Sequence, residues 1–407
     1  MNAAAHADID GRYAWTRLLV SVLIATIGSV GMWSVVVVLP AVQAEFGVDR
    51  AAASLPYTMT MVGFAFGNVA LGRIVDRTGI FLPLVASAAA LFVGYGLAAM
   101  VPSIWAFALL QGLIGFGASS TFGPLIADLS HWFRKRRGVA VAAAASGNYF
   151  AGAIWPLAMQ LTLPDEGWRF TYAAISIFCA ATMVPLALLL RRRAPGALPM
   201  SAGAPASTGQ TRTIDLSPRA LQLLLAVAGI GCCVAMSMPQ VHIVAYCVDL
   251  GFGVARGSEM LSLMLVGGIA SRLASGFLAD YIGGVKTLLI GSVLQCAALV
   301  AYIPFDGLAS LYVVSLVFGL SQGGIVPSYA IIVREYLPAH EAGQRVGIVI
   351  MSTIAGMALG GWLSGWIYDL TGSYAAAFWN GIAFNMLNIA IMTMLLWRTR
   401  IPRILAA

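Results

Sequence analysis

One arginine stands in the middle of an apolar stretch and is the residue of this chain best suited to bind an anion. Arg272 lies in "SLMLVGGIASRLASGFLADYIGG" (262–284), with no other charged residue between Glu259 and Asp280. Its side chain keeps a positive charge at any physiological pH. A charge at the centre of a membrane span costs about 2.5–3.5 kcal/mol on insertion scales, so it marks a functional candidate. The planar guanidinium fits one carboxylate through two parallel hydrogen bonds.

Two further ionisable side chains lie in the apolar segment "PQVHIVAYCVDLGF" (239–252). His242 and Asp249 are seven residues apart, so they share one face if the helix continues that far. A histidine can exchange a proton near neutral pH. We expect His242 to handle a proton or contact the substrate, and Asp249 to accept a proton. The alternatives are a structural histidine and a loop aspartate at the outer end of the helix.

Polar and aromatic residues at a similar depth in other apolar stretches are candidates to line a substrate cavity. Sequence position gives their depth and not the face they occupy, so each has a structural alternative. The serines can pack helices together, and Trp33 and Tyr57 can contact lipid. The candidates are Trp33, Tyr57, Ser119, Ser120, Phe122, Asn148, Tyr149, Gln322, Tyr329 and Ser352.

The composition places these residues in a membrane. Of the 407 residues, 60% are hydrophobic and only 10% are charged, whereas soluble domains carry about 25% charged residues. The charges are clustered, and the apolar runs between them are long enough for spans of about 20 residues. The sequence predicts twelve transmembrane helices.

The basic residues predict the orientation. With the N-terminus inside, nineteen of the 23 lysines and arginines fall in cytoplasmic segments, as the positive-inside rule requires. We therefore expect a multi-pass protein of the inner (plasma) membrane with both termini cytoplasmic. The basic residues form short clusters and no continuous patch, so no nucleic-acid partner is expected, and each cluster is interpreted as a topology anchor.

The chain also contains an internal repeat. A segment rich in Pro, Ala, Gly and Ser (191–217) predicts a cytoplasmic linker between a bundle at 1–190 and a bundle at 218–407. "GRIVDRTG" (72–79) matches "GFLADYIG" (276–283) at an offset of 204, and Pro124 matches Pro327 at an offset of 203. A near-constant offset indicates a duplicated unit. The fold class is therefore an all-α membrane protein with two pseudo-symmetric six-helix bundles and a cavity between them.

The repeated motif resembles the signature of the major facilitator superfamily, Gly-x-x-x-Asp-Arg/Lys-x-Gly. It stands here as Gly72, Asp76, Arg77 and Gly79, and the second copy keeps Gly276, Asp280 and Gly283 but has Tyr281 in place of the basic residue. Glycine permits a tight turn at this loop. The resemblance implies that Asp76, Arg77 and Asp280 form a conformational latch, in which a carboxylate meets a helix N-terminus.

Within that superfamily the chain resembles the monocarboxylate transporters and oxalate/formate antiporters. The similarity rests on "VVVVLPAVQAEFGV" (35–48), on "GFGASSTFGPLIADLSHWFRKRRGVAVAAAASG" (115–147) and on the single arginine of the eighth span. Monocarboxylate transporters carry an Asp four residues before this arginine, where this chain has Gly268, and a lysine in span 1. The oxalate exchanger carries a lysine in span 11, and this chain has neither lysine. One guanidinium predicts one carboxylate per substrate.

These features predict a secondary active transporter of a small monocarboxylate, similar to lactate or pyruvate. Counted from residue 257, Arg272 lies roughly 22 Å below the outer surface, near the midplane. Proton coupling is expected, because an anion moving alone opposes the membrane potential by about 2.3 kcal/mol per 100 mV. The alternatives are an organic-anion exchanger, a drug exporter and a transporter-like sensor. We expect the protein to be a monomer that needs no cofactor or metal. We do not expect an enzyme, because the sequence shows no set of a nucleophile and a base.

Overall fold

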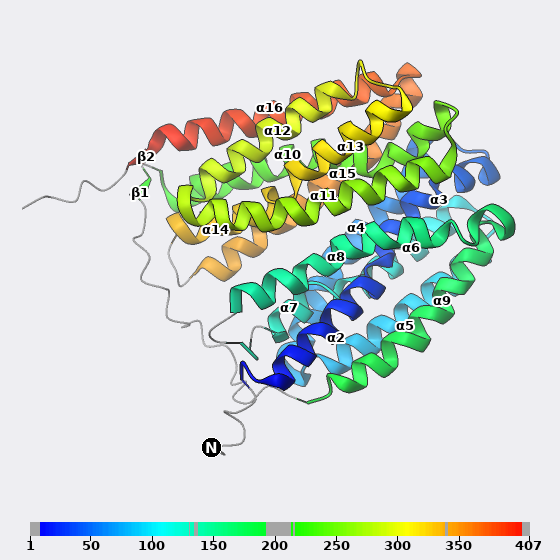
Figure 1. Cartoon of the computed structure of the whole chain (residues 1–407), viewed down its shortest axis with the longest axis horizontal. Coiled ribbons are helices and arrows are strands. Elements are labelled where there is room, and N and C mark those ends of the chain that lie inside the picture. Colours follow the sequence, from blue (N-terminus) through cyan, green and yellow to red (C-terminus); the bar gives the residue numbers. More distant parts are fainter. Residues whose placement is uncertain are drawn as a thin grey trace, which may run out of the picture. The chain divides into compact units, whose positions relative to one another are not determined.

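The computed structural model describes residues 9–129, 131–133, 137–192, 213–214, 216–337 and 341–400. In these ranges the chain is almost entirely helical (Figure 1). The two strands, β1 (Thr213–Ile214) and β2 (Thr399–Arg400), form a short antiparallel pair in which Ile214 opposes Thr399. The all-α prediction is confirmed for the body of the protein.

In the described residues the twelve predicted spans correspond to fifteen helices, because three of the spans are broken. The first half contains α2 (Arg12–Gly28), α3 (Val30–Phe46), α4 (Arg50–Thr78), α5 (Phe81–Ala98), α6 (Ile104–Ser119), α7 (Gly123–Leu129), α8 (Arg137–Met159) and α9 (Leu163–Leu189). The second half contains α10 (Pro218–Asp249), α11 (Gly253–Ile282), α12 (Gly284–Ala301), α13 (Leu308–Gln322), α14 (Ile325–Tyr336), α15 (Ala342–Thr371) and α16 (Tyr374–Arg398).

The described helices agree with the predicted spans. Eleven segments are long and apolar enough to cross a membrane, counting α2 with α3, α6 with α7 and α13 with α14 as single segments. The predicted fifth span is the one outside this set. It lies in α8, whose 23 residues extend about 34 Å at 1.5 Å per residue.

Three spans are interrupted near their centres. Span 1 breaks at Ser29, span 4 breaks between α6 and α7, and span 10 breaks at Gly323–Gly324 between α13 and α14. The Ser29 and Thr121 hydroxyls lie 3.3 Å apart, so the breaks in spans 1 and 4 are neighbours. The interruptions of spans 4 and 10 occupy equivalent positions in the repeat.

The signature motif ends α4 and α11 in the same way. Gly79 has φ of 80° and Gly283 has φ of 85°, a backbone region that favours glycine. The expectation that Gly72 also serves the turn is wrong. Gly72 lies within α4, and its copy Gly276 lies within α11, with open space around both.

The chain divides into two compact units. Unit 1 comprises Met1–Pro199 and Val241–Val266, and unit 2 comprises Met200–Gln240 and Gly267–Ala407. In unit 1, α2 lies beside α8, and α5 beside α9 (Figure 1). In unit 2, α12 packs against α13, α14 and α16. The boundaries proposed at 190 and 218 remain a prediction, and residues 193–212 and 215 of the linker lie outside the described residues.

Glycine allows the closest helix contact in unit 1. A Cβ atom added to Gly63 of α4 would lie 1.9 Å from the carbonyl oxygen of Gly112 in α6. Backbones approach this closely only where the side chain is absent, as in small-residue packing of membrane helices. The α4–α6 contact therefore depends on the absence of a side chain at position 63.

Candidate functional site

Arg272 lies beside the interrupted span 10. Its half-buried side chain extends from α11, and its Nε–H donates to the carbonyl oxygen of Gly323 at 3.4 Å, a long hydrogen bond. A Cβ on Gly323 would lie 2.1 Å from the Gly268 carbonyl oxygen, so glycine allows α11 to approach the break. The helix break thus holds the guanidinium through a backbone carbonyl within the span.

The repeat places a polar residue at the equivalent position of the first half. Asn68 precedes Arg272 by 204 residues, the offset of the signature motif. Its Nδ2 donates to Phe64 O at 2.8 Å, and a Cβ on Gly123 would lie 2.4 Å from its Oδ1. Both halves therefore set a polar side chain beside the break in a neighbouring span. The repeat offset could have identified Asn68 from the sequence.

Gln322 pairs with a residue that the sequence did not single out. Gln240 Nε2 donates to Gln322 Oε1 at 2.7 Å, and both side chains are buried in unit 2. Among the described residues, Gln322 Nε2 has no hydrogen-bond partner. A buried donor without an acceptor is unfavourable by about 1–3 kcal/mol. Gln322 is immediately followed by Gly323, the residue that Arg272 contacts.

His242 is fully buried in α10 and belongs to unit 1, whereas Arg272 belongs to unit 2. Asp249 is the last residue of α10 and forms an ion pair with Arg50, the first residue of α4. Arg50 Nη2 lies 3.0 Å from each Asp249 carboxylate oxygen. Asp249 is therefore part of an interhelical contact and ends the helix, whereas the alternative offered for it was a loop residue. Its expected role as a proton acceptor remains a prediction.

Trp33 and Asn148 are brought together. The indole N–H of Trp33 donates to Asn148 O at 3.0 Å and to Asn148 Oδ1 at 3.1 Å, joining α3 to α8. Trp33, Tyr57 and Tyr149 are all buried, at 5%, 2% and 7% exposure. Trp33 and Tyr57 are therefore buried in protein and not in contact with lipid. The Trp33–Asn148 contact lies within unit 1.

Other predicted cavity residues make structural contacts. Ser119 Oγ donates to Phe116 O at 2.7 Å, and the Ser120 and Ser87 hydroxyls are hydrogen-bonded. Tyr329 is fully buried, and its hydroxyl donates to Asn388 Oδ1 at 2.9 Å. These groups have partners within their own unit.

Two remaining candidates are only partly buried. The ring of Phe122 is half-buried and lies 6.0 Å from that of Phe64. Ser352 Oγ donates to Ile348 O at 3.0 Å within α15. Neither contact indicates a substrate.

The residues of the proposed latch lie at helix ends. Arg77 is exposed in the last turn of α4, and Asp280 is exposed near the end of α11. The side chain of Asp76 lies outside the described residues. The latch therefore remains a prediction.

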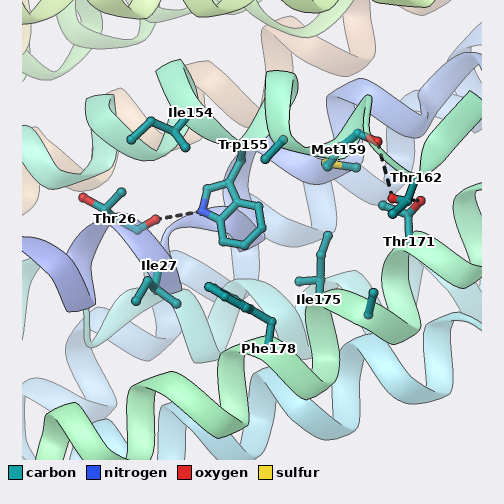
Figure 2. Close-up of a pocket in the computed structure, with 11 residues that line it drawn as sticks. Thr26, Ile27, Ile154, Trp155, Met159, Thr162, Thr171, Ile175 and Phe178 are labelled. Carbon is teal, nitrogen blue, oxygen red and sulfur yellow. Dashed lines mark hydrogen bonds between the residues drawn. The ribbon is translucent and has the colours of Figure 1, made fainter.

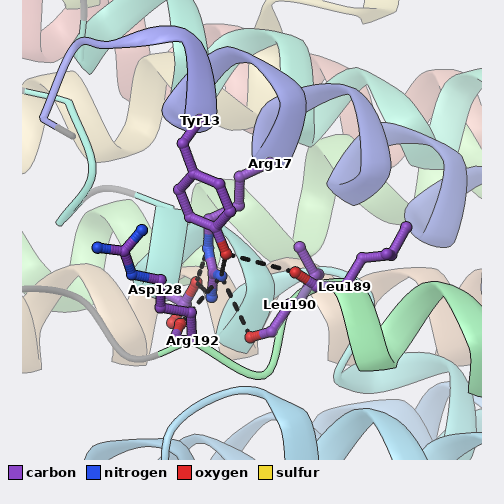
Figure 3. Close-up of polar contacts among 6 residues, drawn as sticks. All are labelled: Tyr13, Arg17, Asp128, Leu189, Leu190 and Arg192. Carbon is purple, nitrogen blue, oxygen red and sulfur yellow. Dashed lines mark hydrogen bonds and ion pairs between the residues drawn. The ribbon is translucent and has the colours of Figure 1, made fainter.

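A buried ion pair at the predicted cytoplasmic side was not recognised from the sequence. Arg17, interpreted as a topology anchor, lies 2.7 Å from Asp128 Oδ2, with side-chain exposures of 1% and 9%. It also donates to Leu190 O and Arg192 O, each at 3.1 Å (Figure 3). The guanidinium carbon lies 4.6 Å from the centre of the Trp132 ring. The sequence feature that could have indicated this ion pair is Asp128, a single acid at the end of a charge-free run.

One cavity in unit 1 is mostly apolar. It measures about 410 Å³ and lies among α2, α8 and α9, with Trp155 donating to Thr26 O at 2.9 Å (Figure 2). Among the described residues that line it none is charged, so it supplies no cation for a carboxylate. A smaller cavity, about 340 Å³, is lined by Arg50 and Asp249.

Comparison with known proteins gives relatives that are transporters. The chain is 26% identical over 308 residues to rat (Rattus norvegicus) monocarboxylate transporter 13, covering 74% of this chain and 69% of that one. It is 29% identical over 282 residues to human (Homo sapiens) monocarboxylate transporter 11, covering 65% of this chain and 58% of that one. It is 24% identical over 293 residues to the MFS-type transporter pynF of Aspergillus niger, covering 70% of this chain and 64% of that one.

The fold is shared with a solved transporter structure. A bacterial homologue of the human lysosomal transporter Spinster, in an inward-facing and unoccupied conformation, superposes with a TM-score of 0.73 at 12% identity. The alignment covers 96% of this chain and 99% of that one. The sequence model of the Major Facilitator Superfamily matches residues 21–309 and 223–405. The chain spans about 58–69% of the length of these curated relatives. It belongs to the major facilitator superfamily and is a multi-pass membrane protein.

Proposed function

We propose that this transporter moves a small monocarboxylate, similar to lactate or pyruvate, by alternating access and together with a proton. The observation that carries the proposal is Arg272, a half-buried guanidinium within α11 beside the break in span 10. A guanidinium within an apolar span is rare and marks a functional candidate. A carboxylate supplies two oxygens that match the guanidinium fork.

The relatives support this class of substrate. Monocarboxylate transporters 11 and 13 are among the curated proteins to which the chain is similar. The positive sign of Arg272 disfavours a site built for cationic drugs. The single arginine of the eighth span favours substrates with one carboxylate, because a dicarboxylate calls for a second cation or equivalent donors.

The buried amides of unit 2 can complete the site. Gln322 Nε2 is a buried donor that lacks an acceptor among the described residues, and a substrate oxygen would supply one. Gln240 Nε2 donates to Gln322 Oε1 and so fixes the Gln322 side chain. We assign Gln322 to the second polar group of the substrate, such as a 2-hydroxyl or 2-keto oxygen.

Coupling to a proton is assigned to His242, with Asp249 as the second candidate. His242 is fully buried, and a histidine can take up a proton near neutral pH. A proton moving with the anion cancels its charge and removes the opposition of the membrane potential. An exchange of anions is the alternative that satisfies the same condition.

The remaining assignments follow from the topology. Asp76, Arg77 and Asp280 act at the cytoplasmic ends of α4 and α11 as the latch that biases one conformation. The protein resides in the inner (plasma) membrane with both termini cytoplasmic. Reaction of a cysteine placed at residue 212 with an impermeant reagent outside intact cells would contradict this orientation.

Uptake into proteoliposomes tests the proposal. Radiolabelled lactate and pyruvate should accumulate when the outside is acidic, and counterflow should occur without a gradient. A sensor would bind the substrate and show no counterflow. Uptake that requires an internal anion and ignores the pH gradient would replace symport by exchange.

A further inference from the structure

The ion pair between Arg50 and Asp249, here called the outer pair, lines a cavity of about 340 Å³. This volume is at the small end of the range of roughly 300–1,000 Å³ for ligand sites. The other lining residues come from the end of α3, the loop after it and α10: Pro40, Gln43, Ala44, Gly47, Val48 and Val248. The cavity is thus apolar around one cation, one carboxylate and one amide.

The Arg50 side chain is buried, whereas the Asp249 side chain is accessible to solvent. The Arg50 side chain is 8% exposed, whereas that of Asp249 is 28% exposed. Arg50 is the first residue of α4, so its partner also lies near the positive end of a 29-residue helix. An anion at this position meets a fixed cation from the protein and has access to solvent.

The outer pair joins elements that are distant in sequence. Arg50 and Asp249 are 199 residues apart, and both belong to unit 1. A second contact of the same kind links Gln160, just after α8, to Ser258 of α11 at 3.0 Å. These contacts hold the adjoining ends of α10 and α11 against the helices of the first half. Any motion that separates these ends must break both contacts.

We infer that the cavity is an outer carboxylate site, where the carboxylate of the substrate takes the place of Asp249 on Arg50 and thereby breaks the outer pair. The inference rests on the proposed function, because it requires a small carboxylate as substrate. The incoming carboxylate has the same chemistry as the group that it replaces. The contact that Asp249 loses and the contact that the substrate gains are of the same kind, so the exchange is nearly balanced.

This exchange couples the binding of substrate to the separation of α10 from α4. Asp249 holds α10 to α4 in the absence of substrate, and a bound carboxylate removes that link while keeping Arg50 neutralised. Gln43, which also lines the cavity, can donate to a second substrate oxygen.

The first test compares the external KM for uptake with the internal KM for efflux. Arg50→Gln should raise the external KM about tenfold or more, equivalent to 1.4 kcal/mol, and change the internal KM by less than about threefold. Asp249→Asn should lower the external KM, because Arg50 is then available to substrate. Arg256→Gln removes an exposed charge of the α11 end, paired with Glu259, and Ser258→Ala breaks the other contact; both should leave the external KM within about twofold.

Other patterns overturn the inference. Equal changes of both KM values in Arg50→Gln would make Arg50 a general structural residue. A rise with Arg256→Gln as large as with Arg50→Gln would indicate long-range attraction of anions. A lowered external KM in Ser258→Ala equal to that in Asp249→Asn would indicate loosening of the helices alone.

A binding measurement covers variants that do not transport and separates this inference from the proposed function. Saturation-transfer NMR with sodium pyruvate should show binding to purified Arg272→Ala protein, with sodium chloride as the competitor control. The signal should be lost in Arg50→Gln/Arg272→Ala. Loss of the signal in Arg272→Ala alone would overturn the outer carboxylate site. Normal uptake by Arg272→Ala would instead overturn the proposed function.

Discussion

Arg17 of α2 and Asp128 of α7 form a buried ion pair, with Nη2 and Oδ2 2.7 Å apart. Arg17 makes this contact while donating to the carbonyl oxygens of Leu190 and Arg192 after α9. The guanidinium thus ties together three parts of unit 1 that are up to 175 residues apart. Its donors and the carboxylate satisfy each other away from solvent.

Removing one partner of this pair should destabilise the protein strongly. Asp128→Asn or Arg17→Met should lower the free energy of unfolding by about 3–5 kcal/mol, because one buried charge remains without its counter-charge. Thermal unfolding in detergent measures the loss. Arg73→Met, at an exposed position of α4, is the control and should change little. Equal stability of Asp128→Asn and the parent would show that the pair contributes nothing.

Two glycines of α4, Gly63 and Gly72, should respond in opposite ways to alanine. Gly63→Ala places a methyl group 1.9 Å from Gly112 O and should cost about 1–3 kcal/mol through overpacking. Gly72→Ala meets open space inside the helix and should be neutral or stabilising by up to about 1 kcal/mol. The melting temperatures of the two variants compare these effects directly. A large loss in Gly72→Ala would instead indicate a role of the signature motif outside the helix.

Removing the amide pair of unit 2 should separate stability from function. Gln240→Met/Gln322→Met eliminates a buried donor without an acceptor, so the melting temperature should stay equal or rise. The KM for a 2-hydroxy or 2-keto acid should rise about tenfold, because one hydrogen bond of about 1.4 kcal/mol is lost. Acetate, which lacks that oxygen, is the control substrate. Equal effects on acetate and lactate would remove Gln322 from the proposed role.

Uptake should increase as the external pH falls from 7.5 to 5.5, because more of the protonated state of the coupling group forms on the outside. The increase should flatten in His242→Gln, which keeps a hydrogen-bonding side chain of similar length. The pH profile of Asp249→Asn, which removes the second candidate for proton coupling, is measured for comparison. An unchanged pH profile in His242→Gln would exclude His242 as the coupling group.

The membrane spans could be predicted because they depend on the length and polarity of local segments. The helix ends at Gly79 and Gly283 were also readable, since the positive φ of a turn favours glycine. Gly72 was misassigned because a motif gives spacing and not the last residue of the helix. The all-helical class and the superfamily resemblance were confirmed on the same grounds.

The side-chain partners could not be predicted in the same way. Counting residues from the end of a span gives the depth of Ser119 or Tyr329 but not the face on which it lies, and both have partners inside their own unit. The pair of Arg50 with Asp249 and the pair of Arg17 with Asp128 connect residues 199 and 111 positions apart. Such contacts depend on how helices pack, which the apolar pattern of a membrane span does not encode.

Uptake of radiolabelled lactate and pyruvate by Arg272 variants in proteoliposomes is the most direct test of the central claim. Arg272→Lys keeps the charge but loses the bidentate geometry. Arg272→Lys should lower kcat/KM roughly thirtyfold or more, which corresponds to a loss of about 2 kcal/mol in interaction free energy. Arg272→Ala should abolish uptake. Melting temperatures close to that of the parent would assign these losses to substrate binding. Near-normal uptake by Arg272→Ala would contradict the assignment of Arg272 to the substrate carboxylate.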